Sequence, residues 1–348
     1  MHEQFDHDSH WVSEQLNIGF LSFSNPLLVS IIKFATPWNF LAAVYTVVFW
    51  DSLTLSFIYA SALGLLWVNI APYLIWYYDE RVLPEFFSNL SELITDVEER
   101  KKLAEKYNRF FADHRLSASF FWTVALVAIV YVSEPALRAQ GMTGAGEIFL
   151  WTTYAYAAYI GSVLGQGFVG PVTTVLLIRE VAQYRLKIDP LHPDNLGGLS
   201  TVGYVSIRTT LLFSSASLFL PLLFFFSSQG GLSTIIFGAV SIYILTIFIS
   251  FVYPTVIVNR RAQVYRDSVL EDLRKEYREI ERSMKEPDID QISELNKRLE
   301  LQRVQRNYEN YNSVSLYPLQ LSILSRLIGS IVLPIFFLLA ELYLPNLL

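Results

Sequence analysis

The chain of 348 residues contains no cysteine, so disulfide bonds, thiolate metal sites and cysteine nucleophiles are excluded. Charged residues are scarce as well: they make up 17% of the sequence, where a soluble protein of this length carries about a quarter. Hydrophobic residues make up 53%. They gather in long runs that alternate with polar segments, and this pattern is typical of a polytopic membrane protein.

Histidine is also rare, and none of the five histidines (His2, His7, His10, His114 and His192) lies in an apolar run. The sequence therefore lacks the intramembrane histidine clusters that membrane metallohydrolases need. No Gly-rich phosphate loop ending in Lys-Ser or Lys-Thr is present, which argues against ATP-driven transport. Because no catalytic constellation is found, we predict no enzyme activity, no cofactor, no metal and no nucleic-acid partner.

The apolar runs predict an all-α polytopic membrane protein with about seven transmembrane helices. Most runs exceed the roughly 20 residues needed to cross about 30 Å of hydrocarbon. Trp50 and Trp151 stand at ends of runs, as is typical of membrane interfaces. The predicted spans are Pro26–Phe49, Leu53–Tyr78, Leu116–Ser133, Ile148–Ile178, Ser206–Phe226, Thr234–Val258 and Leu316–Leu344.

The distribution of basic residues predicts how these spans are oriented. The connections after spans two, four and six, counted together with Arg208 at the start of span five, hold 23 of the 26 Lys and Arg residues, whereas the opposite loops hold only Arg138. Basic loops remain in the cytoplasm. We therefore predict a cytoplasmic N-terminus, an external C-terminus and a location in the plasma membrane. No basic stretch followed by an apolar core opens the chain, so no cleavable signal peptide is expected.

The long cytoplasmic connections are predicted to be helical. Thr95 and Glu98 have the spacing of a capping box, in which a hydroxyl and a carboxylate each bind a free backbone N–H at a helix start. The organisation that follows has four parts. They are a cytoplasmic tail with an amphipathic segment (1–25), spans one to six with a helical connection (79–115) and a turn-rich loop (182–205) within 26–258, a cytoplasmic helical hairpin (259–315), and span seven with the C-terminus (316–348).

Heptad spacing supports the hairpin. Apolar residues recur at intervals of three and four, as along a coiled-coil seam, at Leu270, Leu273, Tyr277, Ile280 and Met284. Pro287 then interrupts the helix, since proline lacks the N–H that a helix interior needs. The spacing returns at Ile292, Leu295, Leu299 and Gln302. We predict two antiparallel arms that pair along these residues.

The loop between spans four and five is the first candidate site. From Asp189 to Leu199 it holds two prolines, Asp-Asn and Gly-Gly, a composition typical of a fixed connection of several turns. His192 and Asp194 have side chains that bind cations or respond to pH. One histidine with two carboxylates is a weak metal signal. The two interpretations are a structural turn and a ligand-binding or gating loop.

A glycine series marks span four. Gly161 and Gly165 lie four residues apart on one helix face, where small residues let a second helix approach closely. Gly167, Gly170 and Pro171 follow them. Such a series also occurs where a transmembrane helix breaks and lines a water-filled pathway. Close helix packing and a broken helix are the two interpretations.

Span seven carries small and polar residues along an otherwise apolar helix. A helix that faces only lipid has no use for such a stripe, so we predict that it lines a pathway or contacts protein. Arg326 either extends to the cytoplasmic headgroups or faces an aqueous path, where it attracts anions. The pathway candidates are Gln320, Ser322, Ser325, Arg326, Gly329 and Ser330.

In topology, this combination of features resembles the insect odorant and gustatory receptor channels. The shared features are seven spans, an internal N-terminus, extended cytoplasmic helices before the last span, and a polar stripe in that span. The last span opens with Leu316-Tyr317-Pro318-Leu319-Gln320, where that family has a Thr-Tyr start and a Gln-Phe pair. The resemblance implies a tetrameric cation channel with pore-lining final helices and cytoplasmic helices that anchor the assembly.

Three functions follow from these features. The favoured one is a homo-oligomeric channel or ligand-gated pore, whose partners are the lipid bilayer, further copies of the chain and a small-molecule ligand. The second is a secondary transporter that uses the glycine series of span four. The third is a scaffold or sensor that transports nothing and recruits a cytosolic partner through the hairpin.

Overall fold

The computed structural model describes residues 10–17, 25–184, 186, 188–194, 196–230, 233–284, 291–314, 328–329, 332, 334–337 and 339. These residues form helices joined by turns, with one isolated antiparallel bridge between Ile94 and Leu186, so the all-α prediction is confirmed for them. Six helical stretches of the described part are long and apolar enough to cross a membrane. They are Pro26–Val48, Leu55–Glu92, Val97–Val132, Glu147–Val181, Ser200–Phe226 and Ile236–Ser283. The predicted seventh span lies mostly outside the described residues.

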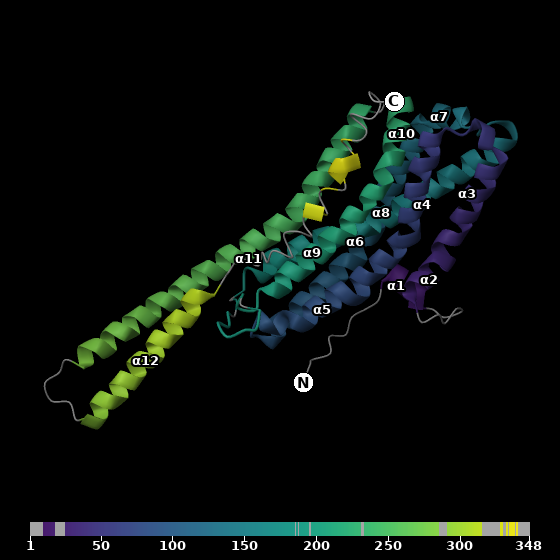
Figure 1. Ribbon diagram of the computed structural model, residues 1–348. Coiled ribbons are helices and arrows are strands. Elements are labelled where there is room, and N and C mark those ends of the chain that lie inside the picture. The colour runs from purple at the N-terminus through teal and green to yellow at the C-terminus, as the bar shows by residue number, and fades with distance from the viewer. Residues whose placement is uncertain are drawn as a thin grey trace.

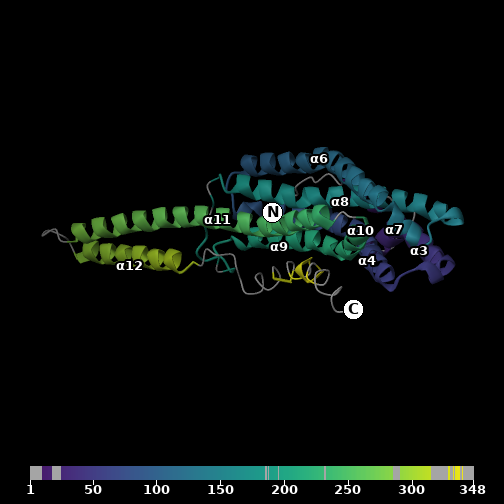
Figure 2. The ribbon, with the colours of Figure 1, turned by 90° about the horizontal axis from the view of Figure 1, so that it is seen from above.

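The helices lie side by side in an elongated bundle (Figures 1 and 2). Its most buried span is α8 (Glu147–Val181), which packs along α6 (Val97–Val132) and also contacts α9 (Ser200–Ser214). One end of the bundle carries α7 (Glu134–Ala139) and is called the α7 end below (Figure 1). The other end carries α5 (Leu83–Ser88) and is called the hairpin end, after the helical pair that projects from it (Figure 1).

The first two spans contain π-helical turns. Span one consists of α2 (Pro26–Ser30), the π-helical turn η1 (Ile31–Ala35) and α3 (Thr36–Val48). Span two is α4 (Leu55–Tyr77), which continues into a second π-helical turn, η3 (Tyr78–Val82). Such turns are rare within helices and are found frequently at functional sites. The turn η3 is therefore a candidate functional element.

The connections predicted at 79–115 and 182–205 pack against each other at the hairpin end. The first forms η3, α5 and the short 3-10 helix η4 (Asn89–Glu92) before α6 begins. The Thr201 hydroxyl donates to the Glu92 carboxylate at 3.0 Å and so joins the two connections. Their apolar side chains share one buried core, which includes Leu83, Phe86, Leu90, Leu186, Leu196 and Leu199. The two connections form a folded cap on the bundle.

The helix predicted ahead of span three and span three itself are one helix, α6. Its N-cap is Asp96, whose Oδ1 accepts the backbone N–H groups of Glu98 at 2.8 Å and Glu99 at 3.1 Å. The prediction that Thr95 caps this helix is therefore wrong by one residue. The Asp96 carboxylate caps the helix in place of the Thr95 hydroxyl because it accepts two free N–H groups at once, next to the positive end of the helix dipole.

Spans five and six differ in regularity. Span five consists of α9, the 3-10 helix η6 (Ser215–Phe219) and α10 (Leu220–Gly230), so its middle departs from α geometry. Span six is continuous with the first hairpin arm in α11 (Ser233–Ser283) (Figure 1). At 1.5 Å per residue, the 51 residues of α11 extend about 77 Å. The hairpin arm is thus a direct extension of a membrane helix.

The second arm, α12 (Gln291–Ser313), runs antiparallel beside the far half of α11 (Figures 1 and 2). Arg274 of α11 donates to the Tyr308 hydroxyl of α12 at 2.6 Å. On α11, the predicted seam residues are buried or half-buried, with Leu270 7% exposed. At its C-terminal end α12 returns to the bundle and leads to Val314, which is buried in the core of the cap.

On α12, the predicted seam is wrong. Ile292, Leu295 and Leu299 are 69%, 59% and 57% exposed. The buried and half-buried residues with heptad spacing are instead Lys297, Leu301, Val304, Tyr308 and Tyr311. Both sets have the same spacing, so the pattern alone did not distinguish them. The attachment of α12 to the cap selects the second set, and the first is left as an apolar stripe on the outer face.

Candidate functional site inside the helix bundle

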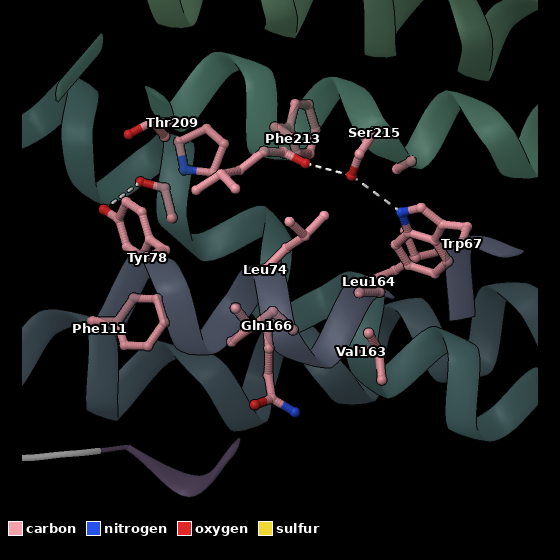
Figure 3. A pocket seen from close by; sticks show the side chains of 17 residues that line it. Trp67, Leu74, Tyr78, Phe111, Val163, Leu164, Gln166, Thr209, Phe213 and Ser215 are labelled. Carbon is pink, nitrogen blue, oxygen red and sulfur yellow. Dashed lines mark hydrogen bonds between the residues drawn. The ribbon is translucent and has the colours of Figure 1, made fainter. Parts of the chain in front are cut away.

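A cavity of about 50 Å³, called the inner cavity below, lies between α4, α8 and the α9–η6 segment (Figure 3). Tyr78 and Phe111 stand at one end, and Trp67 with Ser215 at the other (Figure 3). Trp67 Nε1 donates to the Ser215 hydroxyl at 3.3 Å. Among the described residues, no charged side chain lines this cavity. A space of this size holds a few water molecules, which suits water or a small uncharged solute.

A series of hydroxyl groups joins three helices beside the inner cavity. The Tyr78 hydroxyl of η3 donates to the Gly170 carbonyl of α8 at 2.9 Å (Figure 3). It also lies 3.0 Å from the Thr174 hydroxyl. Thr174 Oγ1 in turn lies 3.1 Å from Thr209 Oγ1 of α9. Buried hydroxyls are costly unless they are hydrogen-bonded. These contacts therefore hold η3, α8 and α9 in one arrangement around the cavity.

A buried pair adjoins the same end of the cavity. Asp79 follows Tyr78 in η3, and its carboxylate accepts the backbone N–H of His10 at 2.9 Å. The other carboxylate oxygen lies 2.5 Å from His10 Nδ1. The exposed fractions are 6% for His10 and 1% for Asp79. The His10 ring stands edge-on to the Phe111 ring, with centroids 4.9 Å apart. The pair thus ties the start of the described chain to the wall of the inner cavity.

Nothing in the sequence pattern indicates that these two residues pair. His10 falls in the predicted cytoplasmic tail, and span two is predicted to end at Tyr78, so that Asp79 is only the first residue of a connection. The available signal was an acid directly after an apolar run, together with a histidine beside an amphipathic segment. Because 69 residues separate the two, only the tertiary structure brings them together.

Two glycines of span four pack against α6. A Cβ on Gly161 would lie 2.5 Å from Thr123 Cα, and a Cβ on Gly165 would lie 2.5 Å from Ser119 Cα. Real Cβ atoms do not approach backbone so closely, so the two helices require glycine here. The Ser119 hydroxyl also donates to the Ser162 carbonyl of α8 at 3.1 Å. These contacts agree with the packing interpretation of Gly161 and Gly165.

The remaining residues of the series border the inner cavity without breaking the helix. Gly167, Gly170 and Pro171 line it, and α8 runs without interruption from Glu147 to Val181. The broken-helix interpretation of the series is therefore not observed in α8. The irregular segments beside the cavity belong to span two, where η3 begins at Tyr78, and to span five, where η6 begins at Ser215.

The turn-rich loop brings His192 and Asp194 together in the cap. His192 Nδ1 lies 2.8 Å from Asp194 Oδ1. The Asp194 carboxylate accepts the backbone N–H groups of Leu196, Gly198 and Ser200 at 2.8 to 3.2 Å. Burial raises the pKa of Asp194, but these hydrogen bonds and His192 outweigh it, so the pKa lies below its ordinary value. Asp194 organises the turn that leads into α9.

A second cavity, called the wedge below, lies at the α7 end between α3, α4, α8 and α10, with a volume of about 210 Å³. Its lining is mostly apolar and aromatic, and among the described residues no charged side chain contributes to it. The Tyr156 hydroxyl is buried there and has no hydrogen-bond partner among the described residues. The ring of Tyr156 packs on Trp38 with centroids 5.2 Å apart. The wedge suits an uncharged, apolar molecule.

Most pathway candidates of span seven lie outside the described residues, namely Gln320, Ser322, Ser325, Arg326 and Ser330. Gly329 is described, and it is exposed. In the described part of the chain, no group of three or more His, Asp or Glu residues is arranged to hold a metal ion. Comparison of the chain with protein-family models, with curated proteins and with solved structures finds no match.

Proposed function

We propose that this protein is a homo-oligomeric membrane channel whose pathway runs between protomers along the final span. The observation that carries the proposal is the exposure of Gly329. No described atom outside its own helix lies within 4 Å of the position that a Cβ on Gly329 would take. Ser322 and Ser325 precede it by seven and four residues, so on a helix they share its face. A polar face of this kind is suited to water or to another copy of the chain.

The described part of the final span contacts its own bundle on one side. Pro334 is buried, and Phe337 packs against a cluster of α10 and α11 residues. Ile328 and Val332 are 54% and 53% exposed. Span six lies beside it and is also less buried than the central α8. In the most apolar part of each helix, 28% of the residues of span six are buried, compared with 61% of those of α8. Both helices are therefore accessible to a neighbouring protomer.

The cavities within one bundle also favour a pathway outside it. The inner cavity and the wedge measure about 50 and 210 Å³ and share no lining residue. A pathway through a single bundle would have to join them between closely packed helices. A pathway at the junction of several protomers needs no such rearrangement, and the last span is the helix that carries the polar stripe.

The orientation that we propose has the hairpin end in the cytoplasm and the α7 end outside, in the plasma membrane. The connections at the hairpin end, together with the helix ends next to them, contain 23 of the 26 basic residues, and positive charge in short loops remains on the cytoplasmic side. The N-terminus is then cytoplasmic. Arg138, at the α7 end, is neutralised by hydrogen bonds to Glu134 and Glu147.

The assembly that we propose is a tetramer, as the topological resemblance implies. The outer face of α12 supports self-association, because Ile292, Leu295 and Leu299 form an exposed apolar stripe with heptad spacing. The wedge is the site that we propose for a small-molecule ligand. Its size exceeds that of the engineered cavities of about 150 Å³ that bind benzene.

Single-channel recording of the purified oligomer in planar bilayers tests the channel. The wild type should conduct, and Gly329→Trp should reduce conductance by about tenfold or more, because the indole narrows the pathway. The matched control is Ile328→Trp, which adds the same group one position along the helix and should leave conductance within about twofold. A folded oligomer that never conducts, or equal conductance in the two variants, would overturn the proposal.

A secondary transporter is the second candidate, and the inner cavity favours it. This cavity borders the 3-10 segment of span five, and interrupted helices commonly line transporter sites. Reconstituted liposomes would then show a solute-dependent proton or sodium flux. Ala216→Leu, which fills the cavity at η6, should abolish that flux, whereas Ala62→Leu in the wedge should not. Conductance without solute coupling would exclude this candidate.

A further inference from the structure

The N-terminal helix α1 (Trp11–Asn17) packs against the membrane bundle through a short apolar face. Val12 and Leu16 are buried in the same apolar core as Trp67 of α4. Lys33 of η1 donates to the Gln15 carbonyl at 2.6 Å. A helix of seven residues is too short to be stable by itself in water. Its position therefore depends on these contacts and on the buried pair that precedes it, His10 and Asp79.

The buried pair and the inner cavity share a wall. Phe111 lines the cavity and also contacts the His10 ring. The Phe111 ring lies 5.8 Å from the Tyr78 ring (Figure 3), and Tyr78 is the backbone neighbour of Asp79. Phe111 and the η3 backbone therefore connect the buried pair to the cavity wall. Displacement of His10 would remove the packing that supports this wall.

The position of Asp79 is coupled to the cavity from a second direction. Asp79 lies in the π-helical turn η3, which begins at Tyr78. The Tyr78 hydroxyl is bonded to Gly170 and Thr174 of α8. A change in the turn at Asp79 is thereby transmitted to the residue that closes the hairpin end of the cavity. Single π-helical turns inside α-helices are found frequently at functional sites.

We propose that the His10–Asp79 contact is a latch that holds α1 over the hairpin end of the inner cavity, and that release of α1 opens this cavity to water from that side. The latch is a property of each protomer and does not depend on the channel between protomers. His10 and Asp79 thus have a gating role, although they lie outside the predicted pathway. Wild-type protein is expected to populate the closed state, with opening as a minor state.

The absence of cysteine makes the latch directly testable, because a single introduced thiol is the only one in the protein. Gly167→Cys is the reporter, since Gly167 lines the inner cavity and a Cβ there meets no described atom within 4 Å. The measurement is its rate of reaction with a water-soluble, membrane-impermeant maleimide in the full-length protein. His10→Gln and Asp79→Asn are the two latch variants, each combined with the reporter.

The expected result is a labelling rate at Gly167→Cys that rises by about tenfold or more in both latch variants, as a population shift toward the open state requires. Ser13→Cys reports on α1 itself, because Ser13 is 1% exposed. Its labelling should rise in parallel. An unchanged rate at Gly167→Cys, or a rise there without one at Ser13→Cys, would overturn the latch.

Two further thiols distinguish opening from general unfolding. Leu191→Cys, at a position 78% exposed in the cap, should label at one rate in every background. Met142→Cys, in the wedge at the α7 end and at a position only 3% exposed, should stay as slow in the latch variants as in the wild type. A rise at Met142→Cys would mean that the bundle loosens as a whole, and it would contradict a local latch. If Asp79→Asn does not fold, His10→Gln alone decides the result, since it keeps the backbone N–H bond to Asp79.

Discussion

Ser119 and Gly165 bring the backbones of α6 and α8 into direct contact. A Cβ on Gly165 would lie 2.5 Å from the backbone nitrogen of Ser119 as well as from its Cα. The hydroxyls of Ser119 and Thr123 each donate to a carbonyl of α8, at 3.1 and 3.2 Å. In lipid, helix association relies on close packing and hydrogen bonds, because lipid tails are as apolar as the helices and supply no hydrophobic driving force. The contact between α6 and α8 is therefore central to the stability of the bundle.

This contact between α6 and α8 predicts opposite effects for substitutions at two neighbouring glycines. Gly165→Ala should destabilise the protein by about 1–3 kcal/mol, since the methyl group forces the helices apart. Gly167→Ala should be neutral or stabilising by up to about 1 kcal/mol, because its Cβ enters open space and alanine favours the helix. Thermal unfolding of the detergent-solubilised variants measures both. Equal losses in the two variants would show that the close contact is not what limits stability.

Breaking the buried pair should be costly. Asp79→Leu leaves the groups of His10 that face it without this partner, and we expect a loss of about 3–5 kcal/mol, the usual consequence of removing one member of a buried pair. A double-mutant cycle of His10→Gln with Asp79→Asn should give a coupling free energy of about 1–3 kcal/mol. The midpoint of chemical unfolding in mixed micelles provides these values. A coupling near zero would mean that the two side chains stabilise the fold independently.

The lowered pKa of Asp194 predicts a dependence of stability on pH. In the unfolded chain the pKa of this carboxyl group is about 3.9, which is above its pKa in the folded protein. The ionised form therefore stabilises the fold at neutral pH, and this contribution disappears as the pH falls below about 4 through the folded pKa. Asp194→Asn should cost about 1–2 kcal/mol at pH 7, as for the loss of a helix cap.

Thermal melts at pH 7 and near pH 3 check this prediction. The difference between wild type and Asp194→Asn should be large at the higher pH and shrink at the lower one. Asp113→Asn, at an exposed position on α6, should behave like the wild type at both. If the Asp194→Asn difference is the same at both pH values, the carboxylate charge is not what organises the loop.

The position of the α12 seam can be tested with two asparagine substitutions. Val304 is 1% exposed, and Val304→Asn should weaken the pairing of the arms by about 2–3 kcal/mol through loss of burial and an unsatisfied amide. Leu295 is 59% exposed, so Leu295→Asn should leave the pairing unchanged. Hydrogen exchange over residues 291–314 of the full-length protein reports the difference. Faster exchange in Leu295→Asn alone would restore the seam first predicted from the sequence.

Local patterns were sufficient for much of this fold. A span such as Glu147–Val181 is recognisable because lipid cannot satisfy an open backbone, so a long apolar run has to be helical. The helix that begins after Asp96 was expected within one residue for a similar reason, since N-terminal N–H groups need a nearby acceptor. Gly161 and Gly165 were correctly singled out as positions of close approach, because four-residue spacing places them on one face.

Other features depend on which helices become neighbours, and no local pattern contains that information. The hydrogen bonds of His10 to Asp79 and of Tyr78 to Thr174 join segments 69 and 96 residues apart. The choice between Leu295 and Val304 as a seam residue follows from the attachment of α12 to the cap. The long apolar runs of the sequence by themselves determined that this protein is a bundle of membrane helices, and the capping and heptad patterns determined that it has helical extensions. Only the tertiary structure decided where its cavities and buried polar contacts lie, because those arise from the packing of residues distant in the chain.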